Sequence, residues 1–138
     1  MRSRRLFTAT VLLVGILGAG AVTARGDGAP ARQWAVVYLA EPTLIGSTIV
    51  QGPVLFTHDN DRMARGEPCT TVRLFEPGAG PTENIAAFHC LPVPRPVARK
   101  FTLRTTPNTD AGFGCVLVEY QFAGDAEGHG VPIGADAH

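Results

Sequence analysis

The chain has 138 residues, with 12 Lys and Arg against 12 Asp and Glu, so its formal net charge is zero. Hydrophobic residues make up 45% and charged residues 17%, which is typical of one globular domain and excludes a wholly disordered, collagen-like or coiled-coil chain. The balanced charge also argues against a nucleic-acid binder, because such proteins normally carry a basic surplus.

Residues 1–24 have the pattern of a secretory signal peptide. Arg2, Arg4 and Arg5 precede an uncharged stretch from 6 to 22, and small residues follow. The alternative is an uncleaved N-terminal anchor, but this stretch is at the short end of the spanning range and contains threonines and glycines. We therefore expect cleavage after residue 21 or 24, secretion or a periplasmic location, and no membrane span after cleavage.

The mature chain is predicted to contain short strands separated by Gly and Pro. The candidate strands, in chain order, are residues 34–39, 43–50, 54–58, 70–75, 84–91, 99–105 and 115–122. Seven such runs predict an all-β fold, a small antiparallel β-sandwich or barrel of about seven strands. We expect this β-domain to cover residues 31–123, with 124–138 as a flexible C-terminal tail because that segment is rich in glycine.

One short helix is expected between the third and fourth strands. Asp59 is a suitable N-cap, and Gly66 is a suitable stop signal, for one or two turns over residues 59–65.

The three cysteines are Cys69, Cys90 and Cys115. In an exported protein we expect a disulfide, and we predict Cys69–Cys90 because the two flank a turn near residues 79–80 symmetrically. That bond would close a loop of about 20 residues and contribute about 3 kcal/mol. Cys115 is expected to stay a free, largely unreactive thiol. The alternative is that all three are buried thiols that pack as small hydrophobic residues.

Histidines are the main candidates for metal ligands. His58 lies where a strand runs into Asp59-Asn60-Asp61, His89 precedes Cys90, and His129 lies in a glycine-rich acidic segment. Neutral imidazoles near carboxylates suit a divalent metal, so His58 and His89, with His129 as a third candidate, are predicted ligands. No HxH, HExxH or CxxC spacing supports this, and the alternative is that these are structural or surface histidines.

A basic segment offers a second candidate site. Arg95, Arg99, Lys100 and Arg104 place four positive charges in ten residues. An anionic ligand near Arg99, Lys100 and Arg104 is one interpretation, and an edge strand protected by its charges is the other.

No catalytic residue can be assigned, because Ser47 is the only serine after the signal segment and no GxSxG motif is present. We therefore expect an exported, non-enzymatic binding or interaction module whose ligand and partner the sequence does not define. The alternative is a metal-binding protein or metal-dependent enzyme that uses His58 and His89, with or without His129, and a divalent metal as its cofactor.

Overall fold

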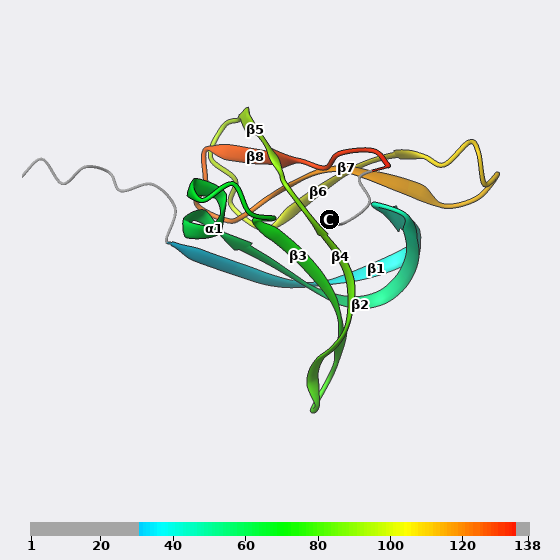
Figure 1. Cartoon of the computed structure of the whole chain (residues 1–138). Coiled ribbons are helices and arrows are strands. Elements are labelled where there is room, and N and C mark those ends of the chain that lie inside the picture. Colours follow the sequence, from blue (N-terminus) through cyan, green and yellow to red (C-terminus); the bar gives the residue numbers. More distant parts are fainter. Residues whose placement is uncertain (1–30, 135–138) are drawn as a thin grey trace, which may run out of the picture.

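The computed structural model describes residues 31–134, which form one strongly curled sheet and a short helix (Figure 1). The elements are β1 (Arg32–Ile45), β2 (Thr48–Asp59), α1 (Asn60–Ala64), β3 (Thr70–Glu76), β4 (Gly80–Phe88), β5 (Leu91–Pro94), β6 (Thr102–Pro107), β7 (Cys115–Gln121) and β8 (Glu127–Gly130). The predicted signal peptide lies outside the described residues. Within residues 31–134, no helix is long and apolar enough to cross a membrane.

The strands follow the order β4-β3-β2-β1-β7-β8-β5, and β6 also pairs with β7. The all-β prediction is confirmed, and the sheet curls into a half-barrel. The sheet is mixed instead of antiparallel, because β1 and β7 run parallel where Thr43 pairs with Cys115. Alternation within a strand does not encode the direction of a partner 72 residues away. The two ends of this order, β4 and β5, are consecutive in the chain, so residues 89–90 connect the two edges of the half-barrel.

The first predicted strand and the beginning of the second form one long strand, β1. Pro42 does not end β1, because the β1–β2 register shifts between Leu39 and Thr43, where a residue without an N–H group is tolerated. Gly46, at a φ of 63°, and Ser47 form the turn into β2, so the predicted run 43–50 is divided between two strands.

The predicted hairpin between β3 and β4 is confirmed. The strands are antiparallel, with Glu76 opposite Gly80 at the turn and Thr70 opposite Phe88 at the far end. Cys69 and Cys90 lie just beyond that far end, which is why the symmetric spacing in the sequence brings them together.

The short helix α1 also forms as expected, directly after β2, and the loop that follows it brings the chain back to the end of β2. The Asp59 carboxylate accepts hydrogen bonds from the backbone N–H groups of Asp61 (3.0 Å) and Arg62 (3.1 Å), which is an N-cap. Gly66 follows with a φ of 72°. The Asp59 N–H donates to the Cys69 carbonyl at 2.9 Å, so this loop places Cys69 beside the end of β2.

The C-terminal segment differs from the expected flexible tail. Residues 127–130 form β8, which pairs with both β5 and β7, and residues 128–130 are buried. A Cβ atom on Gly128 would lie 2.2 Å from Glu119 Oε1, so this glycine permits close packing. Pro92 and Pro94 are tolerated in β5 because it lies at the end of the strand order.

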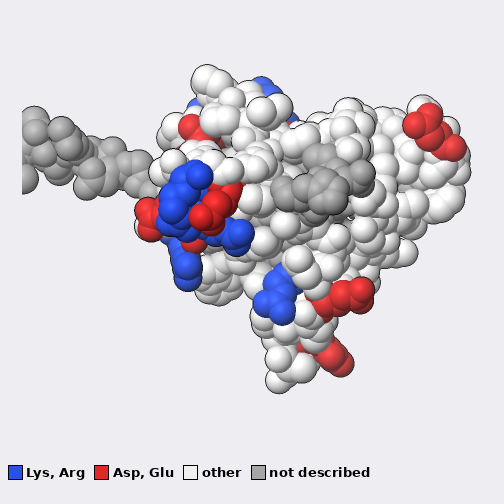
Figure 2. Space-filling view, viewed as in Figure 1, with Lys and Arg blue, Asp and Glu red and all other residues white. Residues whose placement is uncertain are grey.

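The core fills the concave side of the curled sheet. Its fully buried side chains alternate along the strands and include Val54, Phe56, Val72 and Tyr120. The opposite face of β1 leaves Trp34 and Tyr38 each 70% exposed. Figure 2 shows positive and negative side chains gathered together near α1, where Arg32 pairs with Asp59 and Arg65 with Glu67, while much of the visible face carries no charge.

Candidate metal centre

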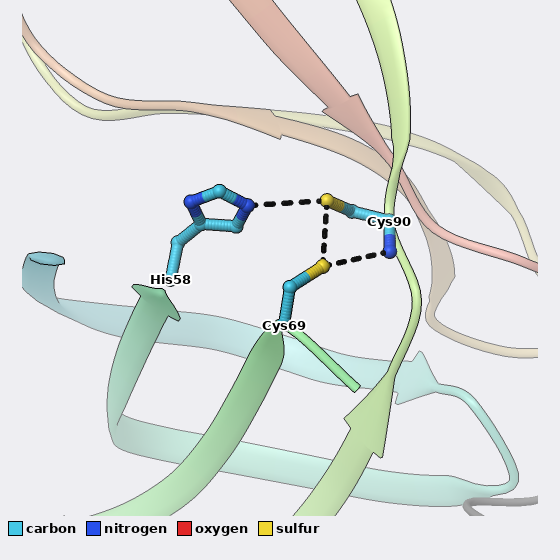
Figure 3. Close-up of side chains that lie close together, drawn as sticks. All are labelled: His58, Cys69 and Cys90. Carbon is cyan, nitrogen blue, oxygen red and sulfur yellow. Dashed lines mark hydrogen bonds between the residues drawn. The ribbon is translucent and has the colours of Figure 1, made fainter. Parts of the chain in front are cut away.

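Four buried side chains with metal-binding atoms lie close together where the β2–β3–β4 side of the half-barrel meets the β8–β5 side. His58 is near the end of β2, Cys69 precedes β3, Cys90 lies between β4 and β5, and His129 is in β8. Figure 3 shows His58, Cys69 and Cys90 pointing toward one another from separate chain segments. Both histidines are 1% exposed, so the site is enclosed by protein.

The Cys90 sulfur is the centre of the cluster. It lies 3.0 Å from Cys69 Sγ, 3.3 Å from His58 Nε2 and 3.5 Å from His129 Nδ1. The donor atoms of His58, Cys69 and Cys90 all lie within 4.8 Å of one another. The rings of His58 and His129 are 4.3 Å apart between centroids.

These separations resemble the edges of a tetrahedral site. Zinc bond lengths give sulfur–nitrogen edges of about 3.6 Å and a sulfur–sulfur edge of about 3.8 Å. The two sulfur–nitrogen distances to Cys90 agree with that geometry. The two sulfurs would have to separate by about 0.8 Å to reach it.

The two thiols do not lose their protons independently. The hydrogen bond with Cys90 lowers the pKa of Cys69, and the same hydrogen bond, together with burial, raises the pKa of Cys90. Removing the second proton from this pair therefore requires a positive charge beside the sulfurs.

His129 is held in the core by aromatic packing. Its ring stacks on Tyr120 with centroids 4.9 Å apart, and the Tyr120 hydroxyl is hydrogen-bonded to Thr70. Burial, with a smaller effect of His58, lowers the pKa of His129, which favours the neutral imidazole that binds metals. His129 Nε2 lies 3.6 Å from Asp125 Oδ2, and the more exposed Glu127 carboxylate lies 4.0 Å from Nδ1.

Of the three predicted histidine ligands, the structure brings two together. His58 and His129 share the cluster, whereas His89 is exposed although it adjoins the buried Cys90. Alternation along the chain separates His89 from Cys90, so His89 does not join the cluster. Cys69 and Cys90 were not among the predicted ligands because a disulfide was expected between them, although their spacing around the turn already placed them side by side.

The predicted disulfide partners are neighbours, but their sulfurs are not bonded in the structure. Their separation of 3.0 Å exceeds the roughly 2.05 Å of a disulfide bond. Cys115 lies apart from them, buried at the start of β7 and within 3.4 Å of the Thr43 hydroxyl. The covalent pairing therefore stays a prediction.

The basic segment is divided by the fold. Arg95 and Arg104 contact the same buried Glu119 carboxylate at 2.6 Å and 3.2 Å, so both are ion-paired within the domain. Arg99 and Lys100 are exposed. The anionic ligand near Arg99, Lys100 and Arg104 stays a prediction, with Arg104 also engaged by Glu119.

The His58–Cys69–Cys90–His129 cluster joins residues that are far apart in the sequence, and any role must be argued from this geometry. Comparison of the chain with protein-family models, with curated proteins and with solved structures finds no match.

Proposed function

We propose that this protein is an exported, non-enzymatic β-domain that binds one zinc ion through Cys69, Cys90, His58 and His129. The observation that carries the proposal is the convergence of the Cys69 and Cys90 sulfurs and His58 Nε2, all within 4.8 Å of one another and from buried side chains. His129 is the fourth ligand in this proposal because its Nδ1 lies 3.5 Å from Cys90 Sγ. Two cysteines and two histidines are a common ligand set for tetrahedral zinc.

Charge favours zinc over a monovalent soft metal. Zn²⁺ with two thiolates and two neutral imidazoles has no net charge, so its burial carries a small electrostatic cost. Cu⁺ with the same ligands would leave one uncompensated negative charge in the core. A divalent ion also supplies the positive charge that a second thiolate requires.

Four protein ligands describe a structural zinc site, because a catalytic zinc keeps a position open for water or substrate. The ligands come from β2, the start of β3, the β4–β5 connection and β8. A zinc ion bound by all four would tie the β2–β3–β4 side of the half-barrel to the β8–β5 side.

Metal analysis of protein made without a His tag tests this proposal. After dialysis against a weak chelator, we expect one zinc per chain in the wild type, and loss of zinc in His58→Ala and Cys90→Ser. His89→Ala is the matched control, because His89 adjoins Cys90 but is exposed. Zinc retained by His58→Ala and Cys90→Ser, or absent from the wild type, would overturn the proposal.

A second measurement needs no variant that risks misfolding. Cobalt added to the metal-free wild type is expected to give the visible absorption of tetrahedral thiolate coordination. Zinc is expected to slow alkylation of Cys69 and Cys90 much more than alkylation of Cys115, which zinc affects only through the stability of the fold. Equal slowing at all three cysteines would point to general stabilisation of the fold and count against the site.

A binding module, our first expectation from the sequence, is supported by a groove along β1, β2 and β3, whose lining also includes His58 and Cys69 of the cluster. Trp34, Val36, Leu55 and Phe75 help line this groove of about 560 Å³, a size within the usual range for small-molecule sites. We expect the dye anilinonaphthalene sulfonate to bind there and quench Trp34, the only tryptophan.

The groove hypothesis has its own control. Leu55→Lys is expected to abolish dye binding, and Phe113→Lys, which changes an exposed side chain outside the groove, is expected to preserve it. Equal binding by both variants would exclude the groove as the dye site.

A further inference from the structure

Unsatisfied polar atoms gather around the two histidines of the cluster. Within residues 31–134, six buried side-chain nitrogen or oxygen atoms have no hydrogen-bond partner. Four of them are the outer ring nitrogens of His58 and His129 and one oxygen each on Gln33 and Asp125. Buried polar atoms are nearly always paired, so a group of unpaired atoms in one place calls for a physical explanation.

Gln33 is placed to serve His58. The two residues are directly opposite each other in the β1–β2 register, and both side chains are buried. Cross-strand neighbours have Cβ atoms about 5 Å apart, a span that a glutamine side chain can bridge. His58 turns Nε2 toward Cys90, which leaves Nδ1 on the other side of the ring (Figure 3). Gln33 Oε1 is an acceptor without a donor, and His58 Nδ1 is a nitrogen without a partner.

Asp125 faces Nε2 of His129, whereas Gln33 is placed on the Nδ1 side of His58. His129 turns Nδ1 toward Cys90, and its Nε2 lies 3.6 Å from Asp125 Oδ2. The other carboxylate oxygen, Oδ1, accepts the Glu127 N–H at 3.1 Å, which fixes the orientation of the carboxylate. Oδ2 is therefore available to accept a hydrogen bond from the Nε2–H of His129.

We infer that Gln33 and Asp125 are the positioning residues of the metal centre, Gln33 accepting the Nδ1–H of His58 and Asp125 accepting the Nε2–H of His129. This inference rests on the zinc site proposed above. A histidine that binds a metal through one nitrogen carries its proton on the other, and an acceptor there fixes the tautomer and the ring orientation. The two histidines thus bind through opposite nitrogens, His58 through Nε2 and His129 through Nδ1.

Zinc affinity of suitable variants tests both residues. Gln33→Leu removes the acceptor at similar size, and Asp125→Asn can keep the oxygen that accepts the Glu127 N–H while placing an NH₂ group toward His129. Each is expected to weaken zinc binding about 10–100-fold in competition with a chromophoric chelator. Gln33→Glu, which restores an acceptor, is expected to rescue the affinity lost in Gln33→Leu.

Nitrogen-15 NMR of the histidine rings separates positioning from general damage. In the zinc-loaded wild type we expect a protonated Nδ1 on His58 and a protonated Nε2 on His129. Gln33→Leu should speed solvent exchange of the His58 ring proton alone, and Asp125→Asn that of His129 alone. Opposite tautomers, or wild-type zinc affinity in both variants, would overturn this inference while leaving zinc binding intact. A wild type without zinc would instead overturn the proposed function.

Discussion

Glu119 is a buried carboxylate whose charge depends on two arginines. Arg95 and Arg104 contact its two oxygens, and the hydrogen bond from Arg95 is the largest cause that lowers the pKa of Glu119 below its ordinary value. A carboxyl group whose pKa is lowered by folding stabilises the folded state above its unfolded pKa of about 4.3, and that contribution is lost as the pH falls through the folded pKa.

We therefore predict that Glu119→Gln destabilises the protein at neutral pH by about 1–3 kcal/mol, the usual cost of losing hydrogen bonds to charged groups. The difference from the wild type should shrink as the pH falls below about 4. Urea unfolding of both zinc-loaded proteins at each pH measures this, since proton competition for the metal affects both alike. A difference that is constant with pH would contradict the assigned ion pairs.

Single residues also show how far the sequence can define a site. His58 was identifiable because a strand ends beside it, and His129 was identifiable only as a histidine of uncertain context. His89 is also a histidine, but its side chain is exposed, because the adjacent Cys90 takes the buried position and neighbouring side chains alternate. Gln33 gave no signal, because its importance arises from the β1–β2 register that places it opposite His58.

At the scale of elements, the parallel contact between β1 and β7 depends on one glycine. Gly114 has a φ of 71°, and a Cβ atom there would lie 2.2 Å from the backbone oxygen of Pro42, beside the Thr43–Cys115 pair. The neighbouring Gly112 has a similar φ of 72° with nothing within 4 Å of its would-be Cβ.

These two glycines make a matched pair of variants. Gly112→Ala is expected to cost about 1–2 kcal/mol, from the left-handed backbone alone. Gly114→Ala should cost about 1–3 kcal/mol more, because the clash is with backbone and must shift the β1–β7 contact. Equilibrium urea unfolding measures both losses, and equal losses would show that the close approach to Pro42 carries no energetic weight.

Local elements were predicted better than distant pairings. The β3–β4 hairpin and α1 follow from turn and capping residues that are adjacent in the sequence. β8 was missed because the groups that it contacts are distant in the sequence. They are the proline-containing β5, the C-terminal part of β7, and the Glu119 carboxylate that packs against Gly128. A glycine that permits close packing and a glycine in a flexible tail have the same sequence signature.

For the whole molecule, zinc is predicted to hold the two edges of the half-barrel together. We expect a strong chelator to lower the melting temperature of the wild type and of Cys115→Ser by the same amount, because a ligand that binds only the folded state adds stability. The chelator should have little effect on Cys90→Ser, which starts at the lower value. Calorimetry measures the three shifts, and an equal shift in Cys90→Ser would place the metal elsewhere.

Export is a separate prediction at this scale. Intact-mass measurement of protein from its natural compartment should show loss of 21 to 24 residues, at the small residues that follow the apolar stretch. A mature chain that begins at Met1 in a membrane fraction would support the anchor interpretation instead.

The oxidising compartment predicted by the signal peptide and the zinc predicted by the fold compete for the same two sulfurs. At 3.0 Å the sulfurs of Cys69 and Cys90 need to close by about 1 Å to form a disulfide or open by about 0.8 Å to bind zinc. Either change is small, and each excludes the other, because a disulfide sulfur no longer offers a thiolate.

We therefore predict that zinc protects the site from oxidation. Oxidised glutathione should convert the metal-free protein to a Cys69–Cys90 disulfide, with two reduced glutathiones released and the protein lighter by two hydrogens, while the zinc-loaded protein should react much more slowly. Peptide mapping without reduction identifies the bond, with Cys115 expected to remain a thiol. The oxidised protein should then bind no zinc until a dithiol reductant restores both cysteines. Stoichiometric zinc in the crosslinked protein would show that the metal does not use these sulfurs, and a Cys90–Cys115 bond would contradict the pairing of β3 with β4 on which the whole site depends.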